Sequence, residues 1–453
     1  MSVNIFSIVL TLIIFIIFFR SQNILDDLII LTITASLFIE MGYFIRIFGF
    51  EIMYYDFLMA LTVIVSFLTN KIMINKKQIL MCIALLTLTF GVFIYFVMKK
   101  NPPLIYSPEI GIDTAFFLGY KALKPWAIEV SHLKSIIKLV FFLLFLIIFY
   151  DRYFNLSFMK RMNTILLKSA FFFHVIIAVV DLITKYIFKK PIFVQILFWI
   201  FGLRSTSQAT NYLGRFGLLG IQGVYAEPSH YAFYAFLVAT YIFFSTKESY
   251  IKKILLINYS VLTFFSTSTT GFIVSVIVFL YFLVSYLNNL KSKYGFIFII
   301  WIIILFVLFF MTLYTYNFFN SNYIKSNINK IIGFLKGRST VSFSELARRN
   351  SIIENLRIFS SYPMFGIGFG STTSTSFLAT LLSNFGIIGV ILYIGIFFPN
   401  GIKIDKKRLV LAFFLLIMLW GGGNLSTIVS PSLVIIIAIY GKKTRLSQIA
   451  PEN

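Results

Sequence analysis

The 453-residue chain is poor in the residues on which many catalytic and metal sites depend. It has one cysteine, Cys82, together with three histidines and 16 acidic residues, and only 12% of it is charged. A single cysteine excludes an intrachain disulfide and a cysteine-based metal site. The sequence contains neither a G-x-x-x-x-G-K-[ST] phosphate loop nor an H-E-x-x-H motif, which argues against an ATP-driven pump and a zinc protease. We therefore expect neither a metal nor a cofactor.

Apolar residues are abundant instead. They make up 59% of the chain, against about 45–50% in soluble domains. Many apolar runs reach the roughly 17–25 residues that cross a bilayer, so we predict an all-α, polytopic integral membrane protein with about 12–14 transmembrane helices in one membrane domain, residues 1–453. The predicted spans are residues 3–19, 28–49, 54–70, 78–98, 132–150, 164–188, 231–246, 254–269, 271–289, 296–318, 377–398, 408–421 and 424–440. The run 192–203 is too short to cross and is expected to be re-entrant or interfacial.

Positive charge is concentrated in short loops. The formal net charge is +23, and with these spans the basic segments all fall on one side, which the positive-inside rule identifies as the cytoplasm. These segments are residues 71–77, 151–161, 247–253, 290–295 and 402–408 and the tail at 442–445. The distribution explains the charge without nucleic-acid binding. The opposite side receives two long extracytoplasmic loops, 186–230 and 319–376.

The first of these loops leads through a polar stretch, residues 204–234, in an otherwise apolar sequence. It holds four residues that carry charge or can transfer protons: Arg204, Arg215, Glu227 and His230. Such residues beside a membrane are costly, which makes them a functional-site hypothesis by default. Pro228 can begin a helix, which would place Glu227 and His230 at the outer mouth of the next span. Either they form an anion-binding and proton-transfer site, or Glu227 pairs with an arginine to close the loop.

The second loop carries Arg338, Arg348 and Arg349. Its apolar spacing predicts an amphipathic helix over 344–356 with Leu346, Ile352, Ile353 and Leu356 on the buried face. Pro363 and the glycines of 366–370 predict a flexible turn after it, and Arg357 is expected to contact lipid headgroups. Arginines that converge on one outer cavity suit a pyrophosphate, because a guanidinium group binds phosphate in a bidentate manner and stays charged.

Within the spans, three polar residues are expected to support structure. His174 lies in the middle of a span and should hydrogen-bond a neighbouring helix. Asp181 should pair with Lys185, four residues later on the same helix.

Four segments resemble, in the same order, motifs of the O-antigen ligase/polymerase superfamily, in particular Wzy-type O-antigen or capsule polymerases. They are V-Y-A-E-P-S-H-Y-A-F (224–233), F-S-T-S-T-T-G (265–271), Arg348 followed by P-M-F-G-I-G-F-G-S (363–371), and L-L-S-N-F-G-I-I-G (381–389). Arg204 and Gly220 also have the R-x15-G spacing of polymerase loops. Ligases of the superfamily carry a histidine shortly before the last segment, where this chain reads S-T-T-S-T-S (371–376), so the resemblance favours a polymerase.

The resemblance implies metal-independent glycosyl transfer at the outer face of the inner (cytoplasmic) membrane. A glycan on undecaprenyl pyrophosphate is the donor, and the sugar hydroxyl of a lipid-linked repeat unit is the acceptor. The partners are then these undecaprenyl-pyrophosphate-linked oligosaccharides and the lipid bilayer, with a chain-length regulator as a further candidate. Two alternatives remain open: a flippase or transporter for the same lipid-linked sugars, and an O-antigen ligase.

We assign roles to the residues on this basis. Arg215 and Arg348 would stabilise the departing pyrophosphate, supported by Arg204, Arg338 and Arg349. Glu227 is the candidate base, with His230 as its hydrogen-bond partner, and these two roles could be exchanged. Tyr225 and Tyr231 could stack on sugars.

Overall fold

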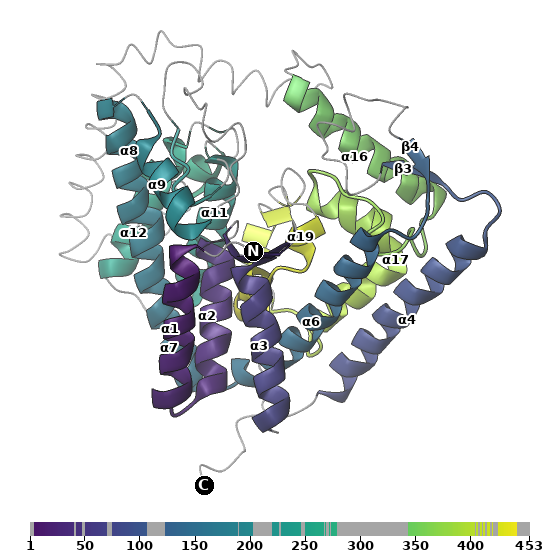
Figure 1. The fold of residues 1–453 in the computed structure, drawn as a ribbon, viewed down its shortest axis with the longest axis horizontal. Coiled ribbons are helices and arrows are strands. Elements are labelled where there is room, and N and C mark those ends of the chain that lie inside the picture. The colour runs from purple at the N-terminus through teal and green to yellow at the C-terminus, as the bar shows by residue number, and fades with distance from the viewer. Residues whose placement is uncertain are drawn as a thin grey trace. The chain divides into compact units, whose positions relative to one another are not determined.

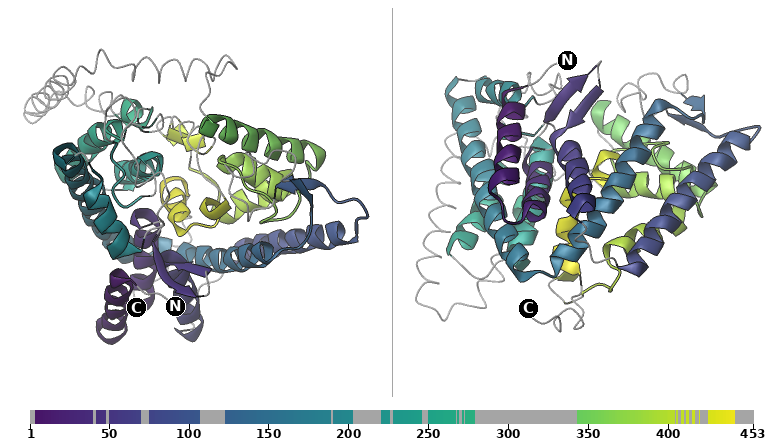
Figure 2. Two further views of the ribbon diagram at one scale, coloured as in Figure 1. Left: turned by 45° about the horizontal axis from the view of Figure 1, so that its top comes forward. Right: turned by 60° about the horizontal axis from the view of Figure 1, so that its bottom comes forward.

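The structure, a computed structural model, consists mainly of helices that belong to two compact units (Figures 1 and 2). The described residues are 4–39, 42–47, 50–69, 75–106, 123–188, 190–202, 220–225, 228–245, 250–266, 343–403 and 425–441, with single positions within 268–278 and 405–419. Unit 1 draws on Met1–Val9, Leu37–Glu51 and Ile165–Thr340. Unit 2 draws on Leu10–Ser36, Ile52–Thr164 and Val341–Asn453.

Four helices in the described part of the chain are long and apolar enough to cross a membrane. They are α4 (Lys76–Met98), α6 (Val130–Tyr153), the continuous helix Leu156–Phe188, and α17 (Phe377–Phe397). They agree with the predicted spans 78–98, 132–150, 164–188 and 377–398. The chain is therefore a predominantly helical membrane protein. The continuous helix is made of α7 (Leu156–Ser169), a π-helical segment (Ala170–Ile176) and α8 (Ile177–Phe188).

Shorter helices occupy four of the remaining predicted spans, whereas the span 296–318 lies outside the described residues and the spans 271–289 and 408–421 are described only in part. These helices are α1 (Ile5–Arg20), α3 (Tyr54–Thr69), α11 (Pro228–Ser245) and α12 (Tyr250–Phe264), and the short run after residue 191 forms α9 (Ile192–Phe201). Helix α11 begins at Pro228 as predicted, because a proline tolerates the first helical position, where its missing N–H is not needed. Its residues from Tyr231 to Ile242 are all buried. A helix that is buried on every side belongs to the interior of its unit.

The predicted span 28–49 is different in the structure. Helix α2 (Ile24–Phe38) ends early, and strand β1 (Tyr43–Ile47) follows and pairs with β2 (Phe50–Met53). The aromatic and β-branched residues of this segment favour a strand. The hairpin also lets Arg46 form an ion pair with Glu51 at the surface, where a longer helix would have carried the charge into the span.

The predicted span 424–440 is also interrupted. It contains α19 (Leu425–Ile428), a 3-10 turn (Pro431–Leu433) and α20 (Val434–Tyr440). Pro431 has no N–H to continue the helix, and Ser430 caps the new turn by accepting a hydrogen bond from the backbone of Ser432 at 3.4 Å.

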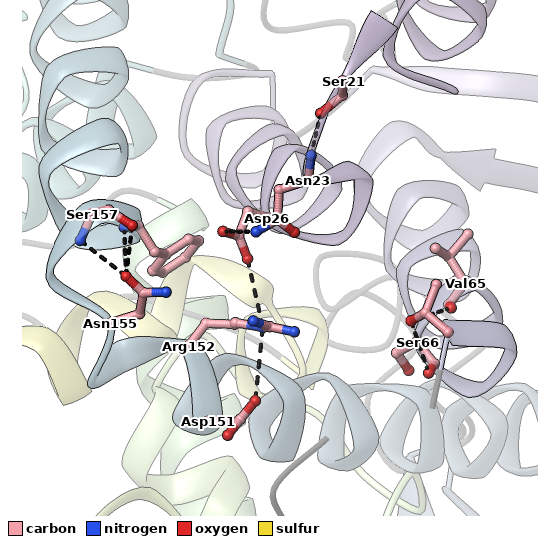
Figure 3. Close-up of polar contacts among 11 residues, drawn as sticks. Ser21, Asn23, Asp26, Val65, Ser66, Asp151, Arg152, Asn155 and Ser157 are labelled. Carbon is pink, nitrogen blue, oxygen red and sulfur yellow. Dashed lines mark hydrogen bonds and ion pairs between the residues drawn. The ribbon is translucent and has the colours of Figure 1, made fainter. Parts of the chain in front are cut away.

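At one end of unit 2, polar contacts join the start of α2 to the end of α6 (Figure 3). Arg152, at the end of α6, faces the buried carboxylate of Asp26 with Nε and Oδ1 3.5 Å apart, and Asn23 donates to the same carboxylate at 2.8 Å. Arg161 pairs with Asp27. These contacts bind the turn before α2 to the turn between α6 and α7. The predicted loop 151–161 is accordingly short, because Asn155 caps α7 by accepting from the backbone N–H of Ser157 at 2.9 Å.

Three further contacts bring the other basic segments of unit 2 to this end. Gln78, in the first turn of α4, donates to the carbonyl of Ile396 near the end of α17 at 2.9 Å. Tyr153 donates to Gly441 at 3.2 Å, and Gly441 forms a bridge with Ile402. The described parts of these basic segments, residues 75–77, 151–161 and 402–403, therefore lie at the same end of unit 2.

The opposite end of unit 2 is formed by different segments. Strands β3 (Leu104–Tyr106) and β4 (Leu123–Pro125) pair antiparallel at the far end of α4, beside α16 (Phe343–Ser361; Figure 1). The indole N–H of Trp126, just after β4, donates to the hydroxyl of Ser371 at 2.8 Å. Lys99, just after α4, donates to the hydroxyl of Tyr362 at 3.1 Å. The described part of the second polar loop therefore lies opposite the basic loops.

Candidate functional site

The predicted site residues fall into three groups. Tyr225, His230 and Tyr231 are in unit 1, and Arg348 and Arg349 are in unit 2. The remaining four lie outside the described residues: Arg204, Arg215, Glu227 and Arg338. The shared pocket of Arg215 and Arg348 therefore stays a prediction, and each unit is considered by itself below.

In unit 1, the end of the first polar stretch is bound to a buried ion pair on α8. The ammonium group of Lys185 lies 3.0 Å from Oδ2 of Asp181, which confirms the predicted pairing. The same oxygen accepts hydrogen bonds from the backbone N–H groups of Gln222 at 2.9 Å and Gly223 at 3.0 Å. Lys185 also donates to the carbonyl of Gly220 at 2.8 Å. Both charged groups thus bind the backbone of residues 220–223.

A second buried group in unit 1 surrounds His174, which lies in the π-helical segment. We call His174, Tyr225, Tyr231 and Tyr259 the histidine–tyrosine cluster. Nδ1 of His174 lies 2.8 Å from the Tyr259 hydroxyl, and Nε2 lies 2.5 Å from the Tyr225 hydroxyl. Tyr231 donates to the backbone carbonyl of His174 at 2.8 Å. The prediction that His174 makes hydrogen bonds between helices is confirmed, and the π segment, a common feature of functional sites, carries it.

The hydrogen bonds of Tyr225 determine one proton position on His174. Tyr225 has a single hydroxyl proton, which it donates to the carbonyl of Leu37 at 2.6 Å. It must therefore accept from Nε2 of His174, so this nitrogen carries a proton.

Tyr225 and Tyr231 have a different role from the predicted one. Both are fully buried, and their hydroxyl groups bind His174 and Leu37. This placement argues against stacking on sugars, because neither ring has a face open to a ligand in the structure. The two rings instead join the polar stretch to the core of unit 1. His230, in the first turn of α11 as predicted, is half-buried.

In unit 2, α16 carries the second set of predicted residues. Its bounds contain the predicted helix 344–356, with Arg348 half-buried and Arg349 exposed. The buried face differs from the predicted one: the side chain of Ile353 is 49% exposed, whereas Asn355 is 2% exposed. The reason is that α16 packs against α17 through hydrogen bonds, not only through apolar contacts. Arg357 pairs with Glu354 at 2.6 Å on the exposed side.

These hydrogen bonds form a buried network that fastens the arginine-bearing helix. Asn355 donates to the carbonyl of Thr373 at 3.2 Å and accepts from the hydroxyl of Ser383 on α17 at 2.6 Å. Ser351 donates to the carbonyl of Arg348 at 2.8 Å and accepts from the backbone N–H of Thr375 at 3.4 Å. The turn that carries Arg348 is therefore tied to the serine- and threonine-rich segment that begins α17.

Helix α17 is interrupted at Gly386, which has φ +60° and ψ −174°. The interruption frees backbone groups on both sides, and the loop that begins at Pro363 binds them. Ile387 and Ile388 donate to Pro363 and Met364 at 2.8 and 3.1 Å. In the other direction, Ile367 and Gly368 donate to Ser383 and Asn384, both at 3.0 Å. Irregular backbone in a span is tolerated when it is buried in protein with its polar groups bound.

The glycine-rich loop 366–370 is accordingly a fixed structure and not the predicted flexible turn. The side-chain oxygen of Asn384 accepts from the backbone of Ser371 at 3.1 Å and of Thr372 at 3.4 Å. The amides of Ile367, Gly368, Ser371 and Thr372 are thus used inside the protein. This arrangement explains the glycines as structural, and it argues against a phosphate-binding role for these four N–H groups.

Lys99 stands beside this loop with its ammonium group over the ring of Tyr362, 5.0 Å from the ring centre. The hydrogen bond to Tyr362 raises the pKa of Lys99 above its usual 10.5. Because the pKa of Lys99 is higher in the folded than in the unfolded protein, protonated Lys99 stabilises the fold. This stabilisation is complete at a pH below the unfolded-state pKa and is lost as the pH rises through the folded-state pKa.

We expect Tyr362→Phe to lower the pKa of Lys99, measured by NMR titration of the methylated lysine, with Lys99→Gln to assign its signal. An unchanged titration would contradict the role of this hydrogen bond.

Asn355 and Asn384, whose hydrogen bonds hold the segments around the candidate site together, were missed by sequence reasoning. Both are uncharged, and charge was the signal used to find the site. The sequence does indicate Asn384, because it is a strongly polar residue inside an otherwise apolar span. Such residues are expected to form hydrogen bonds within the protein.

Among the described residues, no three histidine, cysteine, aspartate or glutamate side chains gather as they would around a metal ion. No protein-family model, curated protein or solved structure matches the chain. Within each unit, two of the motif segments lie close to each other. Ile221, just before the 224–233 segment, donates to Phe265 at 3.0 Å, and the segments 363–371 and 381–389 share the backbone bonds around Gly386.

Proposed function

We propose that the protein is a glycosyltransferase-type polymerase that joins undecaprenyl-pyrophosphate-linked repeat units into O-antigen or capsular polysaccharide. The reaction takes place at the extracytoplasmic face of the cytoplasmic membrane. The sugar hydroxyl of one lipid-linked unit attacks the anomeric carbon of the donor glycan. The bond to undecaprenyl pyrophosphate breaks, and the hydroxyl proton passes to a base.

One observation carries this proposal. Helix α16, with Arg348 and Arg349, is held by a buried hydrogen-bond network at the end of unit 2 opposite the basic loops. Arg348 and Arg349 at that end do not serve membrane orientation, which requires basic residues on the cytoplasmic side. A guanidinium group on a fixed scaffold can stabilise the charge that develops on a departing pyrophosphate without reorganisation.

The remaining roles follow the sequence. Arg215 would act with Arg348 on the pyrophosphate, and Arg204, Arg338 and Arg349 would bind its further oxygens. Glu227 would take the hydroxyl proton, with His230 close by in the first turn of α11. The buried position of Tyr225 and Tyr231 removes them from the proposed sugar contacts.

A flippase is the alternative from another class, and the Asp181–Lys185 pair is the feature that would favour it. Charges inside a span often mark a transport path. Here, however, the described contacts of both groups bind the backbone of residues 220–223. A group that moves during transport would not be expected to carry these fixed bonds.

The test is to incubate the purified full-length protein, in lipid nanodiscs, with lipid-linked repeat units alone. We expect a ladder of products that differ by one repeat unit. The absence of a ladder, combined with movement of a fluorescent lipid-linked sugar across proteoliposomes, would replace the polymerase by a flippase. A product that forms only when a lipid A–core acceptor is added would indicate a ligase.

A further inference from the structure

The Asp181–Lys185 pair is a charged group that the proposed reaction does not use. It lies in the helix Leu156–Phe188, and the two side chains are 0% and 1% exposed. Burying two charges is unfavourable unless additional hydrogen bonds satisfy them. The residues around Asp181 and Lys185 must therefore supply these hydrogen bonds.

The neighbours of Asp181 form an anion-binding turn. The backbone N–H groups of Gln222 and Gly223 both donate to the same oxygen of Asp181, in a turn in which Gly223 has φ +57°. Successive N–H groups in such a turn make a concave site for an anion. The anion here is the carboxylate, whose Oδ2 accepts from both N–H groups and from Lys185 at 2.9 to 3.0 Å. Lys185 completes the arrangement at the carbonyl of Gly220.

We infer that Asp181 is a positioning residue, which sets the path of residues 220–225 and through it the place of His230 in the first turn of α11. This inference rests on the proposed function, because it concerns the same site. Gln222 continues the path by donating to the carbonyl of Tyr225 at 3.3 Å. Tyr225 is then held by His174 and Leu37, and α11 begins three residues later at Pro228. The side-chain oxygen of Asp181 positions residues 220–225 by accepting their hydrogen bonds. The negative charge of Asp181 is neutralised by Lys185.

Two neutral double variants separate the acceptor from the charge. Asp181→Asn/Lys185→Met keeps an oxygen that can accept from Gln222 and Gly223, and Asp181→Leu/Lys185→Met keeps none. We expect the first to polymerise within about threefold of wild type, and the second to lose about a hundredfold in kcat with little change in KM, because small displacements of reacting groups cost this much. Equal kcat values in the two double variants would overturn the inference.

A second measurement is independent of activity. Hydrogen exchange of the backbone amides of Gln222 and Gly223 should be slow in wild type and in the asparagine variant, and fast in the leucine variant. If wild type forms no product ladder but shows this exchange pattern, the proposed function fails and the anchoring of residues 220–225 stands. If wild type forms a ladder and exchange is the same in both double variants, only the inference fails.

If the leucine variant does not fold, the single substitution Gly223→Ala tests the same inference. Gly223→Ala leaves both charges in place, and its Cβ would come no closer than 3.7 Å to another residue, but the positive φ strains the turn. We expect a folded protein with faster exchange at residues 222 and 223 and a kcat several-fold lower. An unchanged kcat together with faster exchange would overturn the inference.

The pair Asp56–Lys138 provides the matched control. Its charged groups lie 2.6 Å apart between α3 and α6, both largely buried. Among the described residues, Oδ1 of Asp56 accepts no hydrogen bond, as is also true of Oδ1 of Asp181, and Oδ2 of Asp56 contacts Lys138 without the backbone N–H groups that bind Oδ2 of Asp181. Asp56→Asn/Lys138→Met and Asp56→Leu/Lys138→Met should therefore have the same kcat as each other. A difference as large as that at Asp181 would show that loss of any buried polar pair impairs the enzyme, which would also overturn the inference.

Discussion

Alanine in place of Gly386 should prevent the protein from folding stably in the membrane. A non-glycine residue is strongly disfavoured at φ +60° and ψ −174°, and the strain amounts to about 1–3 kcal/mol. A Cβ at this position would also lie 2.5 Å from the backbone of Met364, and overpacking costs about 1–3 kcal/mol more. We expect a loss of about 2–6 kcal/mol in the free energy of unfolding. The loss would be measured as a lower unfolding temperature in detergent and less protein in the membrane.

Gly91 offers a matched control, because it lies on the exposed side of another spanning helix, α4. A Cβ there would meet nothing within 4 Å. Gly91→Ala should change stability by no more than about 1 kcal/mol, the difference in helix propensity between the two residues. Gly366→Ala should resemble Gly386→Ala, since its Cβ would lie 2.5 Å from the backbone of Asn384. Equal unfolding temperatures for Gly91→Ala and Gly386→Ala would contradict the interrupted span.

Arg348→Ala should abolish the formation of long glycan chains while the protein still reaches the membrane. Loss of one preorganised donor to a developing negative charge reduces kcat by about 10²–10³-fold. Arg348→Lys keeps the charge but loses bidentate binding, so an intermediate rate is expected. The measurement is the rate of product-ladder formation by purified variants, supported by the length distribution of surface polysaccharide in cells.

Arg357→Ala is the control for this prediction. Arg357 lies on the same helix, and its guanidinium group is exposed and pairs with Glu354. An exposed pair of this kind contributes about 0–1 kcal/mol to stability, and Arg357 has no role in the proposed reaction. The variant should keep wild-type activity. If Arg348→Ala and Arg357→Ala are equally active, Arg348 does not belong to the site.

Part of this architecture could be predicted because it depends on short stretches of sequence. The apolar runs that became α4, α6 and α17 are long enough to span, and the start of α11 follows from Pro228. The Asp181–Lys185 pair follows from a spacing of four residues on one helix. The sorting of basic loops to one end of unit 2 follows from the number of spans between them.

The candidate site was less predictable, because its polar groups bind segments that are distant in the chain. The four-residue spacing that identified the Asp181–Lys185 pair gave no indication of residues 220–223, about 40 positions away. The apolar pattern of α16 predicted an amphipathic surface helix and gave no indication that Asn355 would be buried. The partner of α16 is the polar segment around Ser383 and Asn384.

By itself, then, the sequence determined that the chain is a helical membrane protein, approximately where several of its spans lie, and which end of unit 2 is basic. These properties follow from the length and polarity of single segments, which need no partner. Only the tertiary structure decided that α17 breaks at Gly386, that Asn355 and not Ile353 faces inward, and that Asp181 binds the polar stretch. Each of these depends on which backbone donor or acceptor a distant segment presents. The periodicity of apolar residues within one segment does not indicate which groups a distant segment presents.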